Sequence, residues 1–231
     1  MRGLMLRGRI TPFVAIMGIF AGVSACSSAV AVTPPQRAPQ TVPPARTAAP
    51  VMMFVGDSFT VGSGPVPPWR TYASESARLL GWQPVIAGAG GTGYLNKGKV
   101  GRTFRRSFEE ELAWRPPPDV LVISGGHNDQ RWSTTQVGRA AAELLAEIRH
   151  RWPVTRVFVI GPIWLEDTPS KAYRVRDALA EAAEAAGVPF LDPMRKRWVT
   201  DRPSETVLPD GVHPTLAGHE RIAAWLAAEL L

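Results

Sequence analysis

Five short runs of apolar residues recur along the chain after residue 50, and most of them precede a segment with helical periodicity. Three of these runs are rich in Val and Ile with almost no polar interruption, which is typical of strands that are buried on both faces. The predicted strands cover Val51–Val55, Pro84–Ala87, Val120–Ile123, Val157–Ile160 and Val188–Leu191. Strands that alternate with helices predict a parallel sheet with right-handed crossovers.

Helix starts can be read from capping residues between these strands. Ser133 and Gln136 stand three positions apart, as in a capping box, and predict that a helix begins directly after Ser133. Thr168 and Pro169 precede the next helical stripe as a cap and a first helical residue, a position that favours proline. Together these patterns predict an α/β fold in which helices cover both faces of a five-stranded, mostly parallel sheet.

The first fifty residues have a different pattern from the rest of the 231-residue chain. Three arginines precede an apolar stretch at 10–23 that is too short to span a bilayer comfortably, and small residues follow it. This is the pattern of an export signal, which we place at 1–26. Residues 27–50 are rich in Pro, Ala, Thr and Ser and predict a disordered tether. One folded domain should therefore occupy 51–231.

Two cleavage sites compete at the end of the export signal. Residues 23–26 have the pattern of a bacterial lipobox, which would leave a lipidated Cys26 at the mature N-terminus, whereas 29–31 fit an ordinary small-x-small site. Cys26 is the single cysteine of the sequence, so an internal disulfide is excluded. We expect an exported protein that is either membrane-anchored in the cell envelope through Cys26 or secreted. Membrane fractionation of a Cys26→Ser variant distinguishes these two outcomes.

The charge pattern gives little indication of an anionic partner. The formal net charge is +6, but the arginines of the predicted signal contribute to it, and no nucleic-acid-binding module is recognisable. Five basic residues gather in the middle of the chain, and they are Lys97, Lys99, Arg102, Arg105 and Arg106. This cluster either forms an ordinary solvated surface or faces an anionic polymer of the envelope.

Candidate chemistry lies where the predicted strands end. Ser58 follows the first strand, a glycine-rich turn at 88–93 follows the second, and Asn128 follows the third. Sites in parallel sheets form at the carboxyl ends of strands, so we expect these groups to lie together. Asp210 precedes His213 by three residues, which is close enough for the carboxylate to hold the imidazole by a hydrogen bond. A serine, a histidine and an acid are the parts required for hydrolysis through a covalent acyl intermediate.

The order of these blocks resembles the SGNH, or GDSL-type, esterase superfamily across residues 51–231. Residues 56–58 read Gly-Asp-Ser, as in its first block, although Phe59 stands where many members have Leu. Residues 126–129 match its G-x-N-D block and 210–213 its D-x-x-H block, while several glycines compete in the glycine block. Four blocks in this order are a strong match, although none is specific alone.

The resemblance implies a three-layer α/β/α, flavodoxin-like fold and a serine esterase that needs no cofactor and no metal. Ser58 would be the nucleophile, His213 the general base and Asp210 the orienting acid. The oxyanion would be bound by the backbone N–H groups of Ser58 and Gly91 and by the side-chain amide of Asn128.

Some assignments stay open at this level. Gly90 competes with Gly91 as the oxyanion donor. Asp57 is an alternative acid, although its place in the turn favours a role in backbone hydrogen bonding. A metal site formed by His219 and the D-x-x-H block is a weaker interpretation, because no second ligand pair has zinc-like spacing.

The substrate is predicted only as a class, a small-molecule or polymer-borne acyl ester of the cell envelope, with a short acyl chain or a carbohydrate or lipid alcohol. An acyltransferase could use the same residues, and a non-catalytic envelope lipoprotein could keep the fold as a binding module. The presumed site loops at 63–69, 94–115 and 164–171 lack contiguous Leu, Ile or Phe, which favours short acyl groups. Four tryptophans in or near these loops could contact substrate, and they are Trp69, Trp114, Trp132 and Trp164.

Overall fold

The computed structural model describes residues 48–165, 167–196, 198 and 203–231. The predicted export signal, including Cys26, and most of the predicted tether lie outside these ranges, so both stay predictions. Within the described ranges, no helix is both long enough and apolar enough to cross a membrane.

A five-stranded sheet forms the centre of the folded domain, and each neighbouring pair of strands is parallel. The strand order is β2-β1-β3-β4-β5, so the chain starts near the middle and builds outwards in two directions. The strands are β1 (Val51–Gly56), β2 (Gln83–Gly88), β3 (Val120–Ser124), β4 (Arg156–Ile160) and β5 (Phe190–Leu191). The predicted five-stranded α/β fold is confirmed, and the sheet is wholly parallel.

Several predicted strand ends differ from the structure by one residue, and two element starts were wrong for identifiable reasons. β5 begins at Phe190 and not at Val188, because the Val188 N–H bonds to the end of the preceding helix and Pro189 has no N–H to donate. The helix predicted to begin at Pro169 begins at Ser170, since Pro169 has an extended backbone and is the N-cap.

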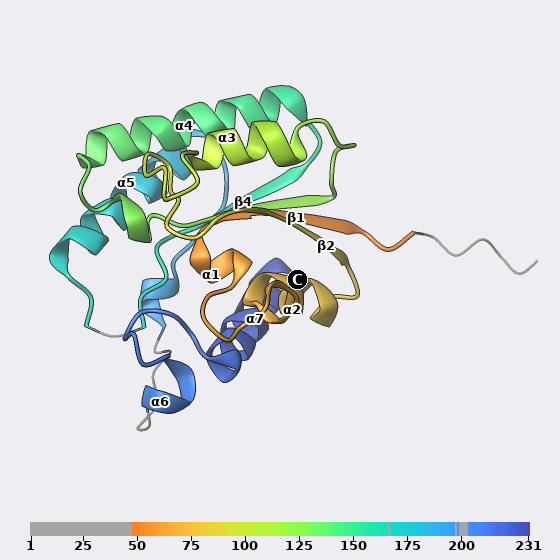
Figure 1. Cartoon of the computed structure of the whole chain (residues 1–231). Coiled ribbons are helices and arrows are strands. Elements are labelled where there is room, and N and C mark those ends of the chain that lie inside the picture. The colour runs from red at the N-terminus through yellow and green to blue at the C-terminus, as the bar shows by residue number, and fades with distance from the viewer. Residues whose placement is uncertain (1–47, 166, 197, 199–202) are drawn as a thin grey trace, which may run out of the picture. The chain divides into compact units, whose positions relative to one another are not determined.

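Helices cover both faces of the sheet and complete a three-layer α/β/α architecture (Figure 1). The α-helices are α1 (Ser58–Val61), α2 (Tyr72–Leu79), α3 (Phe104–Ser107), α4 (Thr134–Arg151), α5 (Ser170–Ala185), α6 (Pro203–Thr206) and α7 (Leu216–Leu230). Three 3-10 turns are η1 (Pro68–Arg70), η3 (His127–Asp129) and η4 (Pro193–Arg195), and η2 (Phe108–Leu112) is a π-helical turn. The capping box of Ser133 and Gln136 is present at the start of α4, as predicted.

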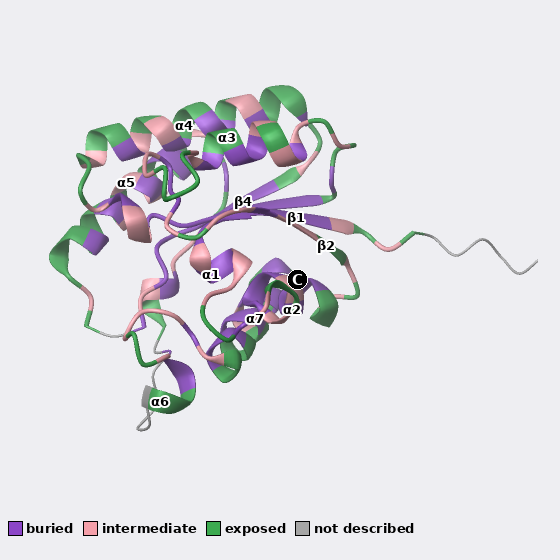
Figure 2. Ribbon diagram, viewed as in Figure 1, coloured by how far each residue is buried: buried purple, intermediate pink, exposed green. Residues whose placement is uncertain are grey.

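Each face of the sheet has its own apolar core. On one face α3, η2, α4 and α5 pack against the strands through side chains such as Phe108, Leu144 and Leu179. On the other face α1, α2 and α7 contribute residues such as Tyr72 and Leu226. Figure 2 shows the buried residues concentrated on the strands and on the helix surfaces that face them. Two buried faces explain why the strands have near-continuous apolar sequences.

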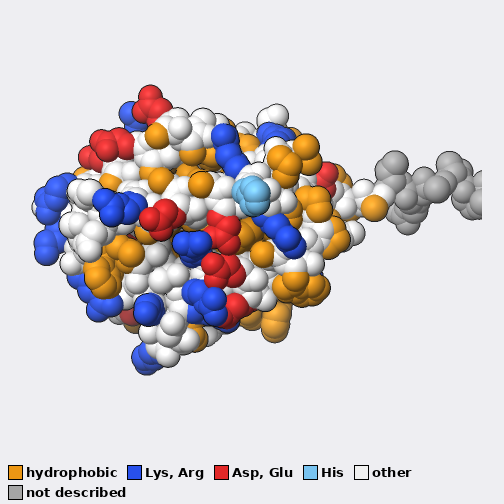
Figure 3. Space-filling view, turned by 90° about the horizontal axis from the view of Figure 1, so that it is seen from above, with side chains coloured by type: hydrophobic (Ala, Val, Ile, Leu, Met, Phe, Trp, Pro, Cys, Tyr) orange, Lys and Arg blue, Asp and Glu red, His pale blue; other side chains and the backbone are white. Residues whose placement is uncertain are grey.

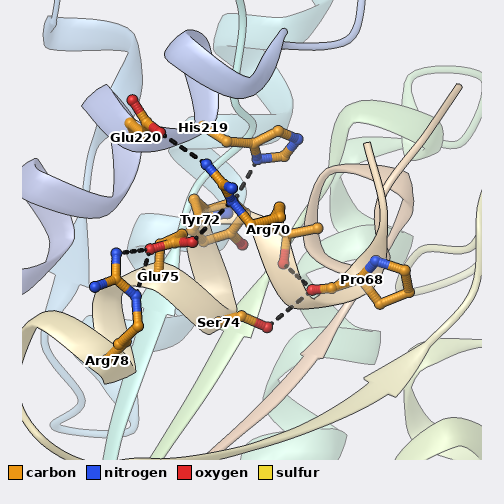
Figure 4. A network of polar contacts seen from close by, with 9 residues as sticks. Pro68, Arg70, Tyr72, Ser74, Glu75, Arg78, His219 and Glu220 are labelled. Carbon is orange, nitrogen blue, oxygen red and sulfur yellow. Dashed lines mark hydrogen bonds and ion pairs between the residues drawn. The ribbon is translucent and has the colours of Figure 1, made fainter. Parts of the chain in front are cut away.

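A polar network ties α7 to α2 and η1 (Figure 4). The ring of His219 accepts the Tyr72 N–H at Nδ1, at 3.0 Å, and Arg70 forms ion pairs with Glu75 at 3.2 Å and Glu220 at 3.1 Å. Burial lowers the pKa of His219 to about 4, so its ring is neutral at neutral pH and can accept a hydrogen bond. The network therefore fixes the helix that follows the D-x-x-H block.

Candidate active site

Ser58 is the first residue of α1, directly beyond the carboxyl end of β1. The preceding residue, Asp57, is the N-cap of this short helix, and its Oδ1 accepts the Phe59 N–H at 3.1 Å. The cap ends the strand and starts the helix within two residues. The Ser58 hydroxyl is consequently presented at the sheet edge at which β1, β2 and β3 also end.

The turn at 210–213 brings an imidazole to this hydroxyl. Asp210 Oδ1 accepts the Val212 and His213 N–H groups at 2.9 and 3.0 Å, which holds the turn. Asp210 Oδ2 lies 2.7 Å from His213 Nδ1, and His213 Nε2 lies 2.8 Å from Ser58 Oγ. Both distances are typical of strong hydrogen bonds. These bonds connect an acid, a base and a hydroxyl that lie near opposite ends of the domain's sequence.

Asp210 is kept ionised by this geometry. Burial by itself would raise its pKa, but hydrogen bonds from the His213 ring and from the His213 and Val212 N–H groups outweigh it and lower the pKa to about 2. The carboxylate can therefore accept a hydrogen bond from a protonated Nδ1 of His213. The unprotonated Nε2 is then free to accept a hydrogen bond from the Ser58 hydroxyl. This arrangement fixes the tautomer of His213, with the proton on Nδ1 and the lone pair of Nε2 facing the Ser58 hydroxyl.

Asp57, the alternative acid, is engaged elsewhere. Besides capping α1, its Oδ2 lies 3.3 Å from the Asn128 amide nitrogen, and the carboxyl group is buried. Burial, reinforced by the nearby Asp129 and opposed by the Phe59 N–H, raises its pKa to about 7. The carboxylate that contacts His213 is that of Asp210, and Asp57 instead organises the turn that carries Ser58.

Several hydrogen-bond donors lie beside Ser58. Within the described residues, the backbone N–H groups of Ser58, Gly90 and Gly91 have no hydrogen-bond acceptor. A Cβ on Gly90 would lie 3.8 Å from the Ser58 Cβ, so the glycine turn passes next to the hydroxyl. Both glycines border the same cleft as Ser58, and the choice between them stays open. Donors free of internal partners are what an oxyanion requires.

Asn128 presents its side-chain amide to the same region. Its Nδ2 donates to the Thr92 carbonyl at 2.9 Å and approaches Asp57 Oδ2 at the longer distance of 3.3 Å. The first contact fixes the plane of the amide, and the second is weak for an N–H···O bond. One N–H of Asn128 is thus anchored by Thr92, the other is only weakly bonded to Asp57, and the residue borders the cleft.

Asp129 is the site residue that the sequence reasoning missed. It is fully buried, and its carboxylate accepts the N–H groups of Tyr94, Leu95 and Asn96 at 2.9 to 3.0 Å. The Asn96 side chain in turn donates to the Gly91 carbonyl at 2.7 Å. Asp129 therefore positions the loop that follows the glycine turn. The aspartate that follows Asn128 in the G-x-N-D block was the sequence signal available for this role.

These residues border an open cleft of about 610 Å³. Its lining residues are Ser58, Ser63, Gly90, Gly91, Asn96, Gly98, Lys99, His127, Asn128, Arg131, Val212 and His213. Apart from the glycines, Val212 is the single aliphatic residue among them. The cleft therefore combines hydrogen-bond donors and charged groups with few aliphatic side chains.

The sequence profile of the GDSL-like Lipase/Acylhydrolase family matches residues 54–221, which contain every residue of this cleft. The chain belongs to this family. A relative from Mycobacterium tuberculosis (strain ATCC 25618 / H37Rv), the GDSL lipase Rv0518, is 35% identical over 194 residues, which cover 75% of this chain and 78% of the relative. The GDSL-family chain is accordingly a carboxylic ester hydrolase, and the non-catalytic alternative is not supported.

Solved structures share the three-layer fold of this GDSL-family chain. A family two carbohydrate esterase from Clostridium thermocellum, solved in complex with cellohexaose, has a TM-score of 0.67 at 22% identity and covers 78% of this chain and 63% of its own. An aryl esterase from M. smegmatis has a TM-score of 0.60 at 20% identity, with 79% and 98% coverage. At these identities the likeness concerns the fold.

None of the four tryptophans considered as substrate contacts lines the cleft of this GDSL-family chain. Trp69 and Trp114 are largely exposed elsewhere, at 72% and 65%. Trp164 and Trp132 instead support cleft residues, because Trp164 stacks on His127 with ring centroids 4.2 Å apart and Trp132 lies 5.2 Å from the Arg131 guanidinium. The structure therefore assigns none of these tryptophans to the lining of the cleft, and contact with substrate stays a prediction.

His127 lies between the Trp164 and Phe59 rings and borders the cleft. Burial lowers its pKa, with a smaller contribution from His213, so the ring is neutral at neutral pH. Its Nδ1 lies 3.3 Å from the Ile163 carbonyl, which can only accept, so this nitrogen carries the proton. Within the described ranges no group of three His, Cys, Asp or Glu side chains could hold a metal ion, and His219 is occupied by Tyr72.

Proposed function

We propose that the protein hydrolyses short-chain acyl esters through an acyl-enzyme formed on Ser58. The observation that carries the proposal is the continuous chain of hydrogen bonds from Asp210 through His213 to Ser58, at 2.7 and 2.8 Å. A serine hydroxyl is a weak nucleophile until a neighbouring base accepts its proton. Membership of the GDSL-like family supplies the class of bond that is cleaved.

The first half of the reaction follows from these contacts. His213 Nε2 takes the Ser58 proton as Oγ attacks the ester carbonyl carbon, and the ionised Asp210 stabilises the imidazolium that forms. The oxyanion receives hydrogen bonds from the Ser58 N–H, from the N–H of Gly91 or Gly90, and from the loosely held N–H of Asn128. When the tetrahedral intermediate collapses, His213 returns the proton to the departing alcohol oxygen.

The second half repeats the same chemistry with water. His213 removes a proton from water, the resulting hydroxide attacks the acyl-enzyme, and Ser58 Oγ leaves with the proton held on the ring. The cleft is open and polar, so water has access to this step. This step releases the acid product and regenerates the Ser58 hydroxyl without consuming a cofactor.

The short acyl preference rests on the composition of the cleft. A bound acyl chain would meet glycine backbone, amides, hydroxyls and imidazoles, with Val212 as the aliphatic exception. A carbohydrate alcohol suits such a polar surface, and we note that the fold relative from Clostridium thermocellum is a carbohydrate esterase. We include acyl esters of envelope carbohydrates among the substrates proposed here.

A fluorophosphonate probe tests the nucleophile. It should label the wild-type protein covalently and spare a Ser58→Ala variant, since the probe reacts with a serine that is activated by a base. Mass spectrometry of the labelled peptide identifies the modified residue. A Ser63→Ala variant is the matched control, because Ser63 borders the same cleft without a base beside it. Labelling that persists in Ser58→Ala, or that disappears in Ser63→Ala, would contradict the assignment.

A further inference from the structure

The basic cluster at 97–106 divides into two parts with different surroundings. Its three arginines pair with glutamates, and these pairs join Arg102 to Glu110 and Glu111, Arg105 to Glu109, Glu143 and Glu147, and Arg106 to Glu109 and Glu110. Figure 3 shows basic and acidic side chains intermixed on the helical face of the molecule. The solvated-surface interpretation therefore holds for the arginines. Lys97 and Lys99, in contrast, have no carboxylate within 4 Å among the described residues.

Lys99 borders the Ser58 cleft. The turn that carries it is packed directly on the glycine turn beside Ser58. A Cβ on Gly98 would come within 2.9 Å of the Gly90 carbonyl oxygen and 3.1 Å of the Gly91 carbonyl carbon. The neighbouring lysine is thus attached to the wall of the cleft that carries the free N–H donors.

A second cation, Arg131, borders the same cleft and is also without a carboxylate partner in the described part of the chain. Its guanidinium donates to Asn96 Oδ1, and Asn96 donates to the Gly91 carbonyl. The Trp132 ring lies 5.2 Å from the guanidinium. These contacts hold the arginine against the same wall as Lys99 and reduce the entropy it would lose on binding a ligand.

No carboxylate residue lines the cleft to balance these two cations. Asp57 and Asp129 are buried beneath it, and their oxygens accept hydrogen bonds from the Ser58 turn and from the 94–96 loop. Asp210 is hydrogen-bonded to His213 Nδ1, the ring nitrogen that does not contact Ser58. Two unpaired cations in a concave site create a positive potential that attracts and orients an anion.

We propose that Lys99 and Arg131 form a subsite for an anionic group, such as a carboxylate, on the alcohol part of the ester. This inference rests on the proposed function, because it names the substrate class of the same site. An unsubstituted short acyl group such as acetyl or butyryl has no charge of its own, so for these esters the anion belongs to the alcohol. An O-acetylated acidic saccharide has this chemistry, with a hydroxyl ester and a carboxylate on one sugar ring.

The test compares substrates that differ in one group, a carboxylate in the first and a neutral carboxamide in the second. The first pair is an O-acetylated methyl glucuronoside and its uronamide, in which a neutral carboxamide replaces the carboxylate. The second pair, 4-acetoxybenzoate and 4-acetoxybenzamide, presents the same contrast without a sugar. The readout is the ratio of kcat/KM for the anionic ester to that for the neutral one, which cancels general effects of a substitution on catalysis.

We expect the wild-type ratio to exceed about 5 for the glucuronoside pair and to fall towards 1 at high salt. Lys99→Gln and Arg131→Gln should each reduce the ratio by about two- to fivefold, and the double variant should bring it to about 1. Lys97→Gln removes an unpaired lysine two positions away that does not border the cleft, so it should keep the wild-type ratio. A preference in both pairs means that charge alone is recognised, and a preference in the sugar pair alone means that the saccharide contributes.

Two outcomes would overturn the subsite, a wild-type ratio near 1 in both pairs or a ratio that the double variant leaves unchanged. If no ester is hydrolysed at all, the proposed function fails and the subsite is tested by binding. Titration of Ser58→Ala protein with the two glucuronosides, followed by NMR, should then give a lower Kd for the anionic one. Equal Kd values would reject the subsite independently of catalysis.

Discussion

At the scale of single residues, two aspartates of the site are shifted in opposite directions by their surroundings. Asp57 is buried next to Asp129, and its pKa rises from 3.8 to about 7. Asp210 is partly exposed but accepts three hydrogen bonds from the 210–213 turn, and its pKa falls to about 2. The same functional group is therefore costly to ionise at one position and stabilised when ionised at the other.

These shifts predict opposite effects on stability. The folded protein binds a proton at Asp57 more tightly than the unfolded chain does, so ionised Asp57 destabilises the fold increasingly from about pH 4 to pH 7. An Asp57→Asn variant should gain free energy of unfolding relative to wild type as pH rises through this window, by up to about 1.4 kcal/mol per unit. Urea denaturation of both proteins at pH 4.5 and 7.5 measures the change.

Asp210→Asn is the control for this experiment. Its folded pKa is lowered, so the stability that Asp210 contributes is present above pH 4 and is lost as pH falls towards 2. Relative to wild type, this variant should show no pH dependence of stability between 4.5 and 7.5 from this group. A constant difference between Asp57→Asn and wild type across that range would show that Asp57 is not protonated in the folded state.

At the scale of elements, the site depends on how one buried acid holds a loop. Asp129 belongs to η3, after β3, but its carboxylate accepts three N–H groups of the segment after β2. A Cβ on Gly93 would lie 2.3 Å from Asp129 Oδ2, so the loop passes too close for any larger residue. The loop holds Gly91 through Asn96. Two neighbouring strand ends are locked together in this way.

Asp129→Asn should consequently lower kcat by about tenfold or more while changing KM little. The amide would present N–H donors to N–H donors, and the glycine turn would lose the position in which it can stabilise an oxyanion. Steady-state kinetics with p-nitrophenyl acetate measure the split between kcat and KM. Melting curves establish that the variant is folded.

Asp119→Asn provides a matched control. Asp119 Oδ2 also accepts a backbone N–H, that of Val51, but at the opposite end of β1 from Ser58. This variant should lose stability without a specific loss of kcat. If the two substitutions reduce kcat equally, the effect of Asp129 is a general consequence of destabilisation and not of loop position.

At the scale of the whole molecule, the cleft beside Ser58 is open and has few aliphatic side chains. Each methylene that a site fully buries contributes about 0.8 kcal/mol to binding. A cleft with a single aliphatic lining residue cannot offer this along a long chain. We therefore expect kcat/KM for p-nitrophenyl esters to be highest from acetyl to butyryl and to decline from octanoyl upward.

The ester series should be measured below the aggregation threshold of each substrate, with Ser58→Ala as the blank. Enzymes with an extended acyl groove show improving kcat/KM as the chain lengthens. A palmitoyl ester hydrolysed as efficiently as the butyryl ester would contradict the prediction and indicate an apolar surface beyond the described cleft.

Much of the fold could be predicted because local patterns carry it. The apolar runs identified all five strands, and the strand–helix alternation gave a parallel sheet covered on both faces. The starts of α5 and β5 were wrong because they lie at prolines, where the missing N–H and the neighbouring cap decide the first residue. The helical pair α3 and η2 was missed within 94–115, since its short segments have too few turns to show a periodicity.

The sequence by itself determined which chemistry is available, because Ser58, Asn128, Asp210 and His213 stand in motifs whose spacing limits their local geometry. The tertiary structure decided what depends on residues far apart in the chain. It placed Asp129 under the glycine loop 33 to 35 positions away, and it separated the glutamate-paired arginines from Lys99. Local spacing constrains a turn, but only the packing of strands and helices determines which side chains meet across the sheet edge, and therefore which charges in the cleft remain unpaired.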